Sequence, residues 1–153
     1  DELTTALELA HQSDEMVLIE AVINGREIEV AVLGNPPKVQ ASTPGEIKAD
    51  GDFYSYDSKY ASGGKSQTII PADLPPEVVQ KIRSQAVSAY TILECRGLAR
   101  VSFFLEADGT LYVNELNTLP GFTNISMYAK LWRHDGISYS QLIKQLITLA
   151  LPR

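Results

Sequence analysis

The pair Asp108-Gly109 is the feature that most constrains what this chain can fold into. It separates two runs of alternating residues, and an Asp-Gly pair in that setting is among the strongest sequence signals of a β-hairpin. A two-residue loop places Ala107 opposite Thr110 and thereby sets the register of both strands. The stretch 98–121 is therefore predicted to contain an antiparallel hairpin.

The predicted register gathers polar side chains on one face of this hairpin. Ser102 lies opposite Glu115, and Arg100 lies opposite Asn117. Side chains alternate across a strand, so these four share a face, whereas a slip of one residue would scramble the two faces. The other face of the first strand is predicted to enter the core through Val101, Phe103 and Leu105. A cation, a carboxylate and an amide in register indicate a site.

A second group of candidate residues is a pair of acids on either side of the turn Asn24-Gly25. The run Met16–Ile23 is predicted to be a buried strand that contains Glu20, and the chain returns in a second strand over 27–33. An acid inside an apolar strand must be paired or must bind a ligand. For Glu20 and Glu27 the alternative, solvated surface charge, stays open.

Apolar residues at helical spacing predict helices in several places. The predicted segments are 3–10 with Asp1 as its cap, Pro75 to about Cys95, a short piece near 124–133, and the C-terminal stretch capped by Ser138. The long helix that begins at Pro75 is interpreted as a packing helix without chemistry. A further short strand is predicted between 39 and 47, interrupted at Pro44-Gly45.

The loop 61–67 contains Gly64-Lys65-Ser66, which looks like the end of a phosphate-binding P-loop. That motif also requires a glycine where this chain has Lys59, so the P-loop interpretation fails. Two interpretations remain for the loop: a mobile cover over a ligand, or an ordinary surface loop.

Composition limits the class of protein. A chain of 153 residues with 44% hydrophobic residues is predicted to form one soluble globular domain. The net charge of −6 argues against nonspecific binding to nucleic acids or anionic membranes, and the single Cys95 favours a reducing compartment. No apolar run approaches the roughly 20 residues that span a bilayer. The chain begins at Asp1, inside a predicted helix, and is therefore expected to be a fragment.

Several separated segments resemble the C-terminal part of the D-alanine–D-alanine ligases, ATP-grasp enzymes that make the dipeptide of peptidoglycan. In chain order the segments are 20–27, 30–34, 53–60, 100–104 and 114–127. The resemblance covers 1–153 and implies an α/β (α+β) fold, the ATP-grasp C-terminal subdomain. It implies a mostly antiparallel sheet with helices packed on one face and the nucleotide on the other. The family's N-terminal and central domains are expected to be absent from this chain, which alone should lack ligase activity.

The resemblance assigns several residues to the nucleotide. Glu20 matches the residue that reads the adenine amino group, and Ala21 to Ile23 match the hinge beside it. Glu27 matches the acid that holds the ribose hydroxyls, Phe104 an apolar residue under the adenine ring, and Lys59 a phosphate-binding lysine. The adenine slot is therefore expected between the Glu20 strand and the hairpin strand that carries Phe104.

The resemblance also assigns groups around the reacting atoms. Arg100 and the backbone of Gly121 match groups that bind the oxygens of the acyl phosphate and of the tetrahedral intermediate. Tyr60 matches a tyrosine that helps to define the second-substrate site and favours an amine nucleophile. Ser126 and Met127 match the clamp on the carboxylate of the second substrate.

The metal ligands implied by the resemblance are Glu115 and Asn117, for magnesium or for manganese in its place. Hard oxygen donors two residues apart on a strand can reach one ion, and nucleotide phosphates can fill its remaining positions. Ser102 departs from the family, which has an aspartate there as a ligand of a second ion. The number of bound ions, one or two, therefore stays open.

The implied activity is the ATP-dependent ligation of two D-alanines through an acyl phosphate, in the cytoplasm. The implied partners are ATP and D-alanine, without nucleic acid or membrane, and a homodimer of the full-length enzyme stays open. One alternative is a ligase that uses D-serine or D-lactate, or another ATP-grasp carboxylate–amine ligase. The other is a non-catalytic nucleotide-binding or interaction domain on the same fold.

Overall fold

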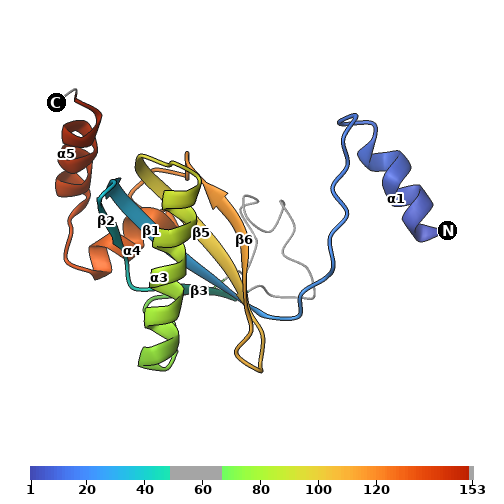
Figure 1. Cartoon of the computed structure of the whole chain (residues 1–153), viewed down its shortest axis with the longest axis horizontal. Helices are drawn as coiled ribbons and strands as arrows, with labels where there is room; N and C mark the ends of the chain where they lie inside the picture. Colours follow the sequence, from blue (N-terminus) through green and yellow to red (C-terminus); the bar gives the residue numbers. More distant parts are fainter. Residues whose placement is uncertain (49–66, 152–153) are drawn as a thin grey trace.

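The computed structural model describes residues 1–48 and 67–151 (Figure 1). In chain order its elements are α1 (Glu2–Ala10), β1 (Arg26–Asn35), β2 (Lys38–Ala41), β3 (Gly45–Lys48), β4 (Gln67–Ile69), α3 (Pro76–Ile92), β5 (Gly97–Leu105), β6 (Leu111–Asn117), α4 (Met127–His134) and α5 (Tyr139–Ala150). Lys59, Tyr60 and the Gly64-Lys65-Ser66 segment lie outside the described residues. No helix in the described ranges is long and apolar enough to cross a bilayer.

The strands form one antiparallel sheet in the order β4-β3-β1-β5-β6, and β2 lies beside the second half of β1. β1 is the central strand, because it pairs with β5 along one edge and with both β2 and β3 along the other. The predicted α/β fold with an antiparallel sheet is confirmed. The strand expected over 39–47 is also confirmed, as β2 and β3 with the predicted interruption between them.

The helix α3 covers one face of the sheet, as Figure 1 shows. The core between them contains Ile28, Val30 and Val32 of β1, the predicted Val101, Phe103 and Leu105 of β5, and Ile82, Ala86 and Tyr90 of α3. The expected packing role of this helix is therefore confirmed. The helix was expected to run to about Cys95 but ends at Ile92, and Leu93, its C-cap, is 62% exposed.

The helices α4 and α5 pack on the opposite face, so helices cover both faces of the sheet and not one. This second core contains Ala31 and Leu33 of β1 with Tyr128, Leu131, Trp132 and Leu142 of the two helices. The difference from the expectation has a local cause in β1. Its second half, residues 30–33, is buried at every position and can therefore pack a layer on each side. On the face opposite α3, the first half of β1 is not covered by α4 and α5 and stays available for a site.

Two helix N-termini have the caps that the sequence predicts. Asp1 accepts a hydrogen bond at Oδ1 from the amide of Thr4, at 2.9 Å. Ser138 and Gln141 form a capping box, in which each side chain accepts from the other's backbone amide. These bonds satisfy amides that have no partner within the helix, which explains where α1 and α5 begin.

The hairpin of β5 and β6 forms, but its loop is longer than predicted. The amide of Glu106 donates to the carbonyl of Thr110, and the amide of Gly109 donates to the carbonyl of Glu106, both at 3.0 Å. Ala107 therefore does not face Thr110, and that prediction is wrong. Gly109 has a φ of 86°, which suits the last position of a three-residue loop.

A β-bulge in β6 corrects the register before the strands reach the polar positions. Phe103 pairs with Val113, whereas Ser102 pairs with Glu115, so Asn114 is an extra residue in β6. One extra residue in the loop and one in the strand offset each other. The predicted pairing of Ser102 with Glu115 is thus confirmed, although the loop expected to produce it is a different one.

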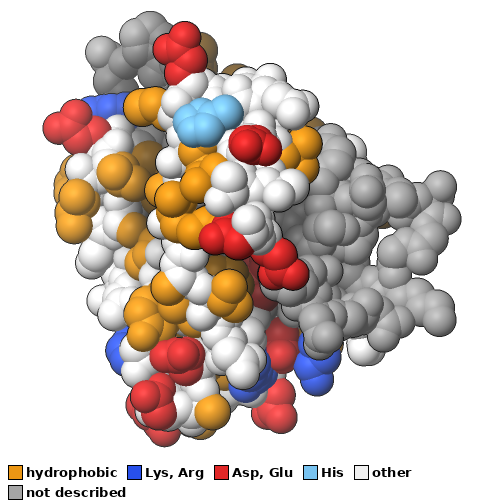
Figure 2. All heavy atoms as spheres, turned by 90° about the vertical axis from the view of Figure 1, so that its right-hand side faces the viewer, with side chains coloured by type: hydrophobic (Ala, Val, Ile, Leu, Met, Phe, Trp, Pro, Cys, Tyr) orange, Lys and Arg blue, Asp and Glu red, His pale blue; other side chains and the backbone are white. Residues whose placement is uncertain are grey.

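The predicted strand Met16–Ile23 is wrong. This segment has no regular structure, and Met16, Leu18 and Val22 are more than three-quarters exposed. Figure 1 shows it leaving the sheet toward α1, and Figure 2 shows hydrophobic and acidic side chains mixed on the face seen from that side. A strand needs a neighbour for its backbone, and none of the described strands pairs with this segment.

A partly buried ion pair joins β1 to β3 on the α3 face. Arg26 donates to both carboxylate oxygens of Glu46, at 3.0 and 2.7 Å, and Glu46 is 4% exposed. The hydrogen bonds from Arg26, and then its charge, hold the pKa of Glu46 below the ordinary 4.5. This contribution to stability is complete above that ordinary value and is lost as the pH falls through the lowered pKa.

We expect Glu46→Gln to lower the free energy of unfolding by about 1–3 kcal/mol at neutral pH, since it weakens a charged hydrogen-bond pair. The difference from the wild type should shrink in acid, where Glu46 is protonated in both the folded and the unfolded chain. Urea unfolding of the complete protein at neutral and strongly acidic pH measures both values. A difference that does not change with pH would contradict this expectation.

Candidate functional site

Three strands bring polar side chains into rows on the face opposite α3. Glu29 of β1 pairs with Ser102 of β5, and Ser102 pairs with Glu115 of β6. In the next row Arg100 pairs with Asn117, as predicted. The four hairpin residues proposed from the sequence therefore lie together.

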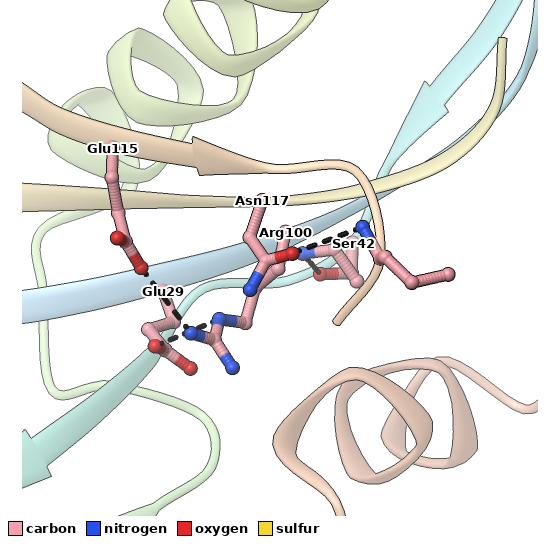
Figure 3. Close-up of polar contacts among 7 residues, drawn as sticks. Glu29, Ser42, Arg100, Glu115 and Asn117 are labelled. Atoms are coloured by element: carbon pink, nitrogen blue, oxygen red, sulfur yellow. Dashed lines mark hydrogen bonds and ion pairs between the residues drawn. The ribbon is translucent and has the colours of Figure 1, made fainter. Parts of the chain in front are cut away.

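Arg100 lies between two acids, as Figure 3 shows. Its Nε is 2.9 Å from Oε1 of Glu29, and its Nη2 is 3.5 Å from Oε1 of Glu115. The two acids differ in exposure: the side chain of Glu29 is 1% exposed and that of Glu115 is 51% exposed. The guanidinium of Arg100 thus contacts the buried Glu29 at Nε, and its Nη2 faces the exposed carboxylate of Glu115.

Sequence reasoning missed Glu29. Its signal is present in the alternation of β1, where Glu27 and Glu29 share a face and Ile28 and Val30 share the other. This alternation places Glu29, two residues after Glu27, on the same face as the polar residues of the hairpin.

Asn117 is oriented by its own backbone. Its Oδ1 accepts a hydrogen bond from the amide of Leu119, at 2.9 Å, and Figure 3 shows the carboxamide beside Arg100. A carbonyl oxygen has two lone pairs, so Oδ1 of Asn117 can accept this hydrogen bond and still bind a metal ion.

The donor chemistry of this face fits one divalent cation better than two. Glu115 offers a half-exposed carboxylate and Asn117 an amide oxygen, whereas Ser102 is 2% exposed and offers only a neutral hydroxyl. Within 1–48 and 67–151 no group of three or more His, Cys, Asp or Glu could hold a metal. Nucleotide phosphates would therefore have to supply most of the coordination, which is usual for magnesium.

The expected nucleotide residues are brought together in part. Glu27 pairs with Phe104 across β1 and β5, in the row beside Glu29 and Ser102, and both side chains are half-buried. Glu20 lies in the exposed segment without regular structure, as do Ala21 and Ile23. The strand expected to carry Glu20 is thus absent, and the adenine slot between Glu20 and Phe104 stays a prediction.

The expected second-substrate residues follow β6. Ser126 precedes α4, and its Oγ accepts from the amide of Thr123 at 3.0 Å. A Cβ on Gly121 would lie 3.4 Å from that Oγ, so Gly121 and Ser126 are neighbours. Met127 begins α4 and packs against the second core, close to Gly45 of β3. Its side chain therefore anchors the helix.

Comparison with known proteins gives consistent matches over this chain. Residues 1–148 match the family model described as D-ala D-ala ligase C-terminus. The curated D-alanine--D-alanine ligase A of Salmonella typhimurium is 53% identical over 148 residues, which are 97% of this chain and 40% of that protein. The chain thus spans less than half the length of this relative.

Two solved structures have the same fold over nearly the whole chain. The D-alanine-D-alanine ligase from Coxiella burnetii has a TM-score of 0.84 at 40% identity, covering 97% of this chain and 38% of that one. The VanG D-Ala:D-Ser ligase from Enterococcus faecalis has a TM-score of 0.87 at 37% identity, covering 98% of this chain and 43% of that one. These ligases have the ATP-grasp fold.

Proposed function

Since the chain belongs to the D-alanine–D-alanine ligase family, matching its C-terminal part, we propose that it carries the nucleotide and metal sites of an ATP-dependent ligase that joins two D-alanines. The observation that carries the proposal is the shared face of β1, β5 and β6. There Glu115 lies in the row next to the pair of Glu27 and Phe104, and Arg100 and Asn117 lie in the row beyond it.

Each residue on this face has a separate task in the proposal. Phe104 contributes apolar contact for the adenine ring, and Glu27 accepts hydrogen bonds from the ribose hydroxyls. Arg100 stabilises negative charge on the phosphoryl and acyl oxygens, since a preorganised cation needs little reorganisation during reaction. Lys59 and Tyr60, outside the described residues, are assigned to the phosphates and the second substrate.

Glu115 and Asn117 would hold the magnesium ion, which supplies Lewis-acid neutralisation of the nucleotide phosphates when bound. Ser126, beside Gly121, is assigned to the carboxylate of the second substrate. The product would be the dipeptide used for peptidoglycan, made in the cytoplasm, where ATP is available.

A second candidate is a ligase for D-serine. The observation that favours it is the likeness to the VanG D-Ala:D-Ser ligase, with a TM-score of 0.87. Sequence identity of 53% to a D-alanine--D-alanine ligase favours D-alanine as the second substrate.

The test is competitive turnover by the complete protein with ATP and magnesium. D-Alanine as first substrate is offered together with equal amounts of D-alanine, D-serine and D-lactate, and the products are separated by mass. We expect the D-alanine dipeptide to predominate. A mainly D-serine product would favour the second candidate, and absence of any ATP-dependent product would support a non-catalytic domain.

The second prediction for this site concerns Ser102→Asp. Without metal the variant should be less stable than the wild type, because it buries another carboxylate between Glu29 and Glu115. With magnesium and a non-hydrolysable ATP analogue it should gain more thermal stability than the wild type, since the cation binds the added carboxylate only in the folded protein. A thermal-shift titration with magnesium at fixed analogue measures both. An equal or smaller gain would mean that position 102 does not face the metal.

A further inference from the structure

Glu29 contacts Arg100 from a position with no assigned role. The two ion pairs of Arg100 in the described residues are unequal, at 2.9 Å to Glu29 and 3.5 Å to Glu115. Glu29 is also almost fully buried, and Glu115 is half exposed. Arg100 thus has a shorter, buried ion pair with β1 and a longer, exposed contact with β6.

The buried partner should hold Arg100 more strongly. A carboxylate with 1% exposure has lost its hydration, so separating it from a cation is costly. An exposed pair at 3.5 Å is screened by water and contributes little. Arg100 is therefore anchored by Glu29, and its contact with Glu115 can be given up readily.

This inequality bears on cation binding at Glu115. A guanidinium and a magnesium ion would compete for the same carboxylate oxygens, because both are cations that bind oxygen. If Arg100 were released from β1, Glu115 would be its remaining acidic partner in the described residues. The stronger pair that would then form would oppose the metal.

We propose that Glu29 is a positioning residue: it anchors Arg100 on β1 and so keeps the Glu115 carboxylate available to a divalent cation. The inference rests on the proposed function, because it assumes that Glu115 binds the metal of a nucleotide complex. It adds that Glu29 acts through Arg100, without touching the nucleotide or the metal.

The test uses the complete protein and a non-hydrolysable ATP analogue. The quantity measured is the magnesium concentration at half-maximal binding of the saturating analogue, followed by fluorescence or calorimetry. In Glu29→Gln this midpoint should rise by about tenfold or more, in the range typical of lost outer-shell partners of metal ligands. Glu29→Asp retains the charge but retracts it by one methylene group, and should give a smaller rise.

The decisive variant is the double substitution Glu29→Gln with Arg100→Gln. It removes both charges of the buried pair, so neither is left unpaired, and it removes the cation that would compete for Glu115. The magnesium midpoint should return to within about threefold of the wild type, although ligation stays impaired because Arg100 is lost. A purely structural role for Glu29 predicts no such return.

Glu46→Gln is the matched control. Glu46 also pairs with an arginine and is 4% exposed, but it lies on the α3 face of the sheet. It should lower stability and leave the magnesium midpoint unchanged.

The outcomes separate this inference from the proposed function. A Glu29→Gln midpoint equal to that of the wild type, or a double variant no better than the single one, would overturn the role of Glu29 alone. A wild-type protein that binds the analogue without any dependence on magnesium would overturn the proposed metal site and this inference with it.

Discussion

Glu115→Gln in the complete protein should lower kcat by about a hundredfold or more, equivalent to roughly 3 kcal/mol of lost transition-state stabilisation. Glu115 is the exposed carboxylate of the polar rows on β5 and β6, and the neighbouring position 102 is a neutral serine. Glutamine keeps the shape but removes the negative charge, and magnesium tolerates few neutral substitutes for a carboxylate.

The measurement is steady-state ATP-dependent ligation over a range of magnesium concentrations. Excess magnesium should restore little of the activity, because the loss is expected mainly in the transition state. Glu106→Gln is the control: it makes the same change in the same hairpin, at the loop end away from the rows. Wild-type turnover in Glu115→Gln would remove Glu115 from the proposed metal site.

The largest expected loss of stability comes from Gly34→Ala, at about 3 kcal/mol or more. Gly34 has a φ of 126°, where side chains are strained, and a Cβ there would overlap the carbonyl oxygen of Lys38. The overlap is with backbone, so rotating a side chain cannot relieve it. The carbonyl of Gly34 also accepts a hydrogen bond from the buried hydroxyl of Tyr90, at 2.9 Å.

Chemical unfolding of the complete protein measures this loss, and Gly136→Ala separates its two causes. Gly136 also has a positive φ, of 88°, but nothing lies within 4 Å of a Cβ built there. Its substitution should cost only the backbone strain, roughly 1 kcal/mol. Equal losses in the two variants would mean that the overlap at Lys38 relaxes without cost.

The residues on the polar face of the hairpin were predictable from the sequence, but the loop length and the bulge that set their register were not. Alternation in β5 correctly separates Arg100 and Ser102 from the apolar residues of the core. The loop length and the bulge at Asn114 depend on backbone geometry that alternation does not encode. The predicted register at the site was right because these two unpredicted features cancel.

The failure at Met16–Ile23 has a different cause. An apolar run indicates that a segment could be buried, but not that another strand will pair with it. Among the described residues the sheet runs in the order β4-β3-β1-β5-β6, and 16–23 is not one of its strands. Glu20 therefore remains a prediction that rests on the family resemblance, whereas Glu27 has its expected place beside Phe104.

Glu29 and the second helical layer were missed for a common reason. Both follow from β1 being a central strand: residues 30–33 are buried on both faces, and an acid just before them becomes buried as well. The sequence shows that β1 is apolar, but the strand order that makes it central comes from long-range pairing. Because β1 has neighbouring strands on both sides, the carboxylate of Glu29 is buried and must be paired, although the sequence alone suggests a solvated charge.

The extra residue in β6 also bears on which changes of chain length this protein can tolerate. From the hairpin loop to Val113 the strands run in one register, and the next residue in that register would face Ser102. Deleting Asn114 would therefore place Glu115 at that same position, straightening the strand without moving the acid to the other face. Deletion between Glu115 and Asn117 has no such compensation and would separate Asn117 from Arg100. A one-residue deletion should accordingly be accepted at Asn114 and rejected between Glu115 and Asn117.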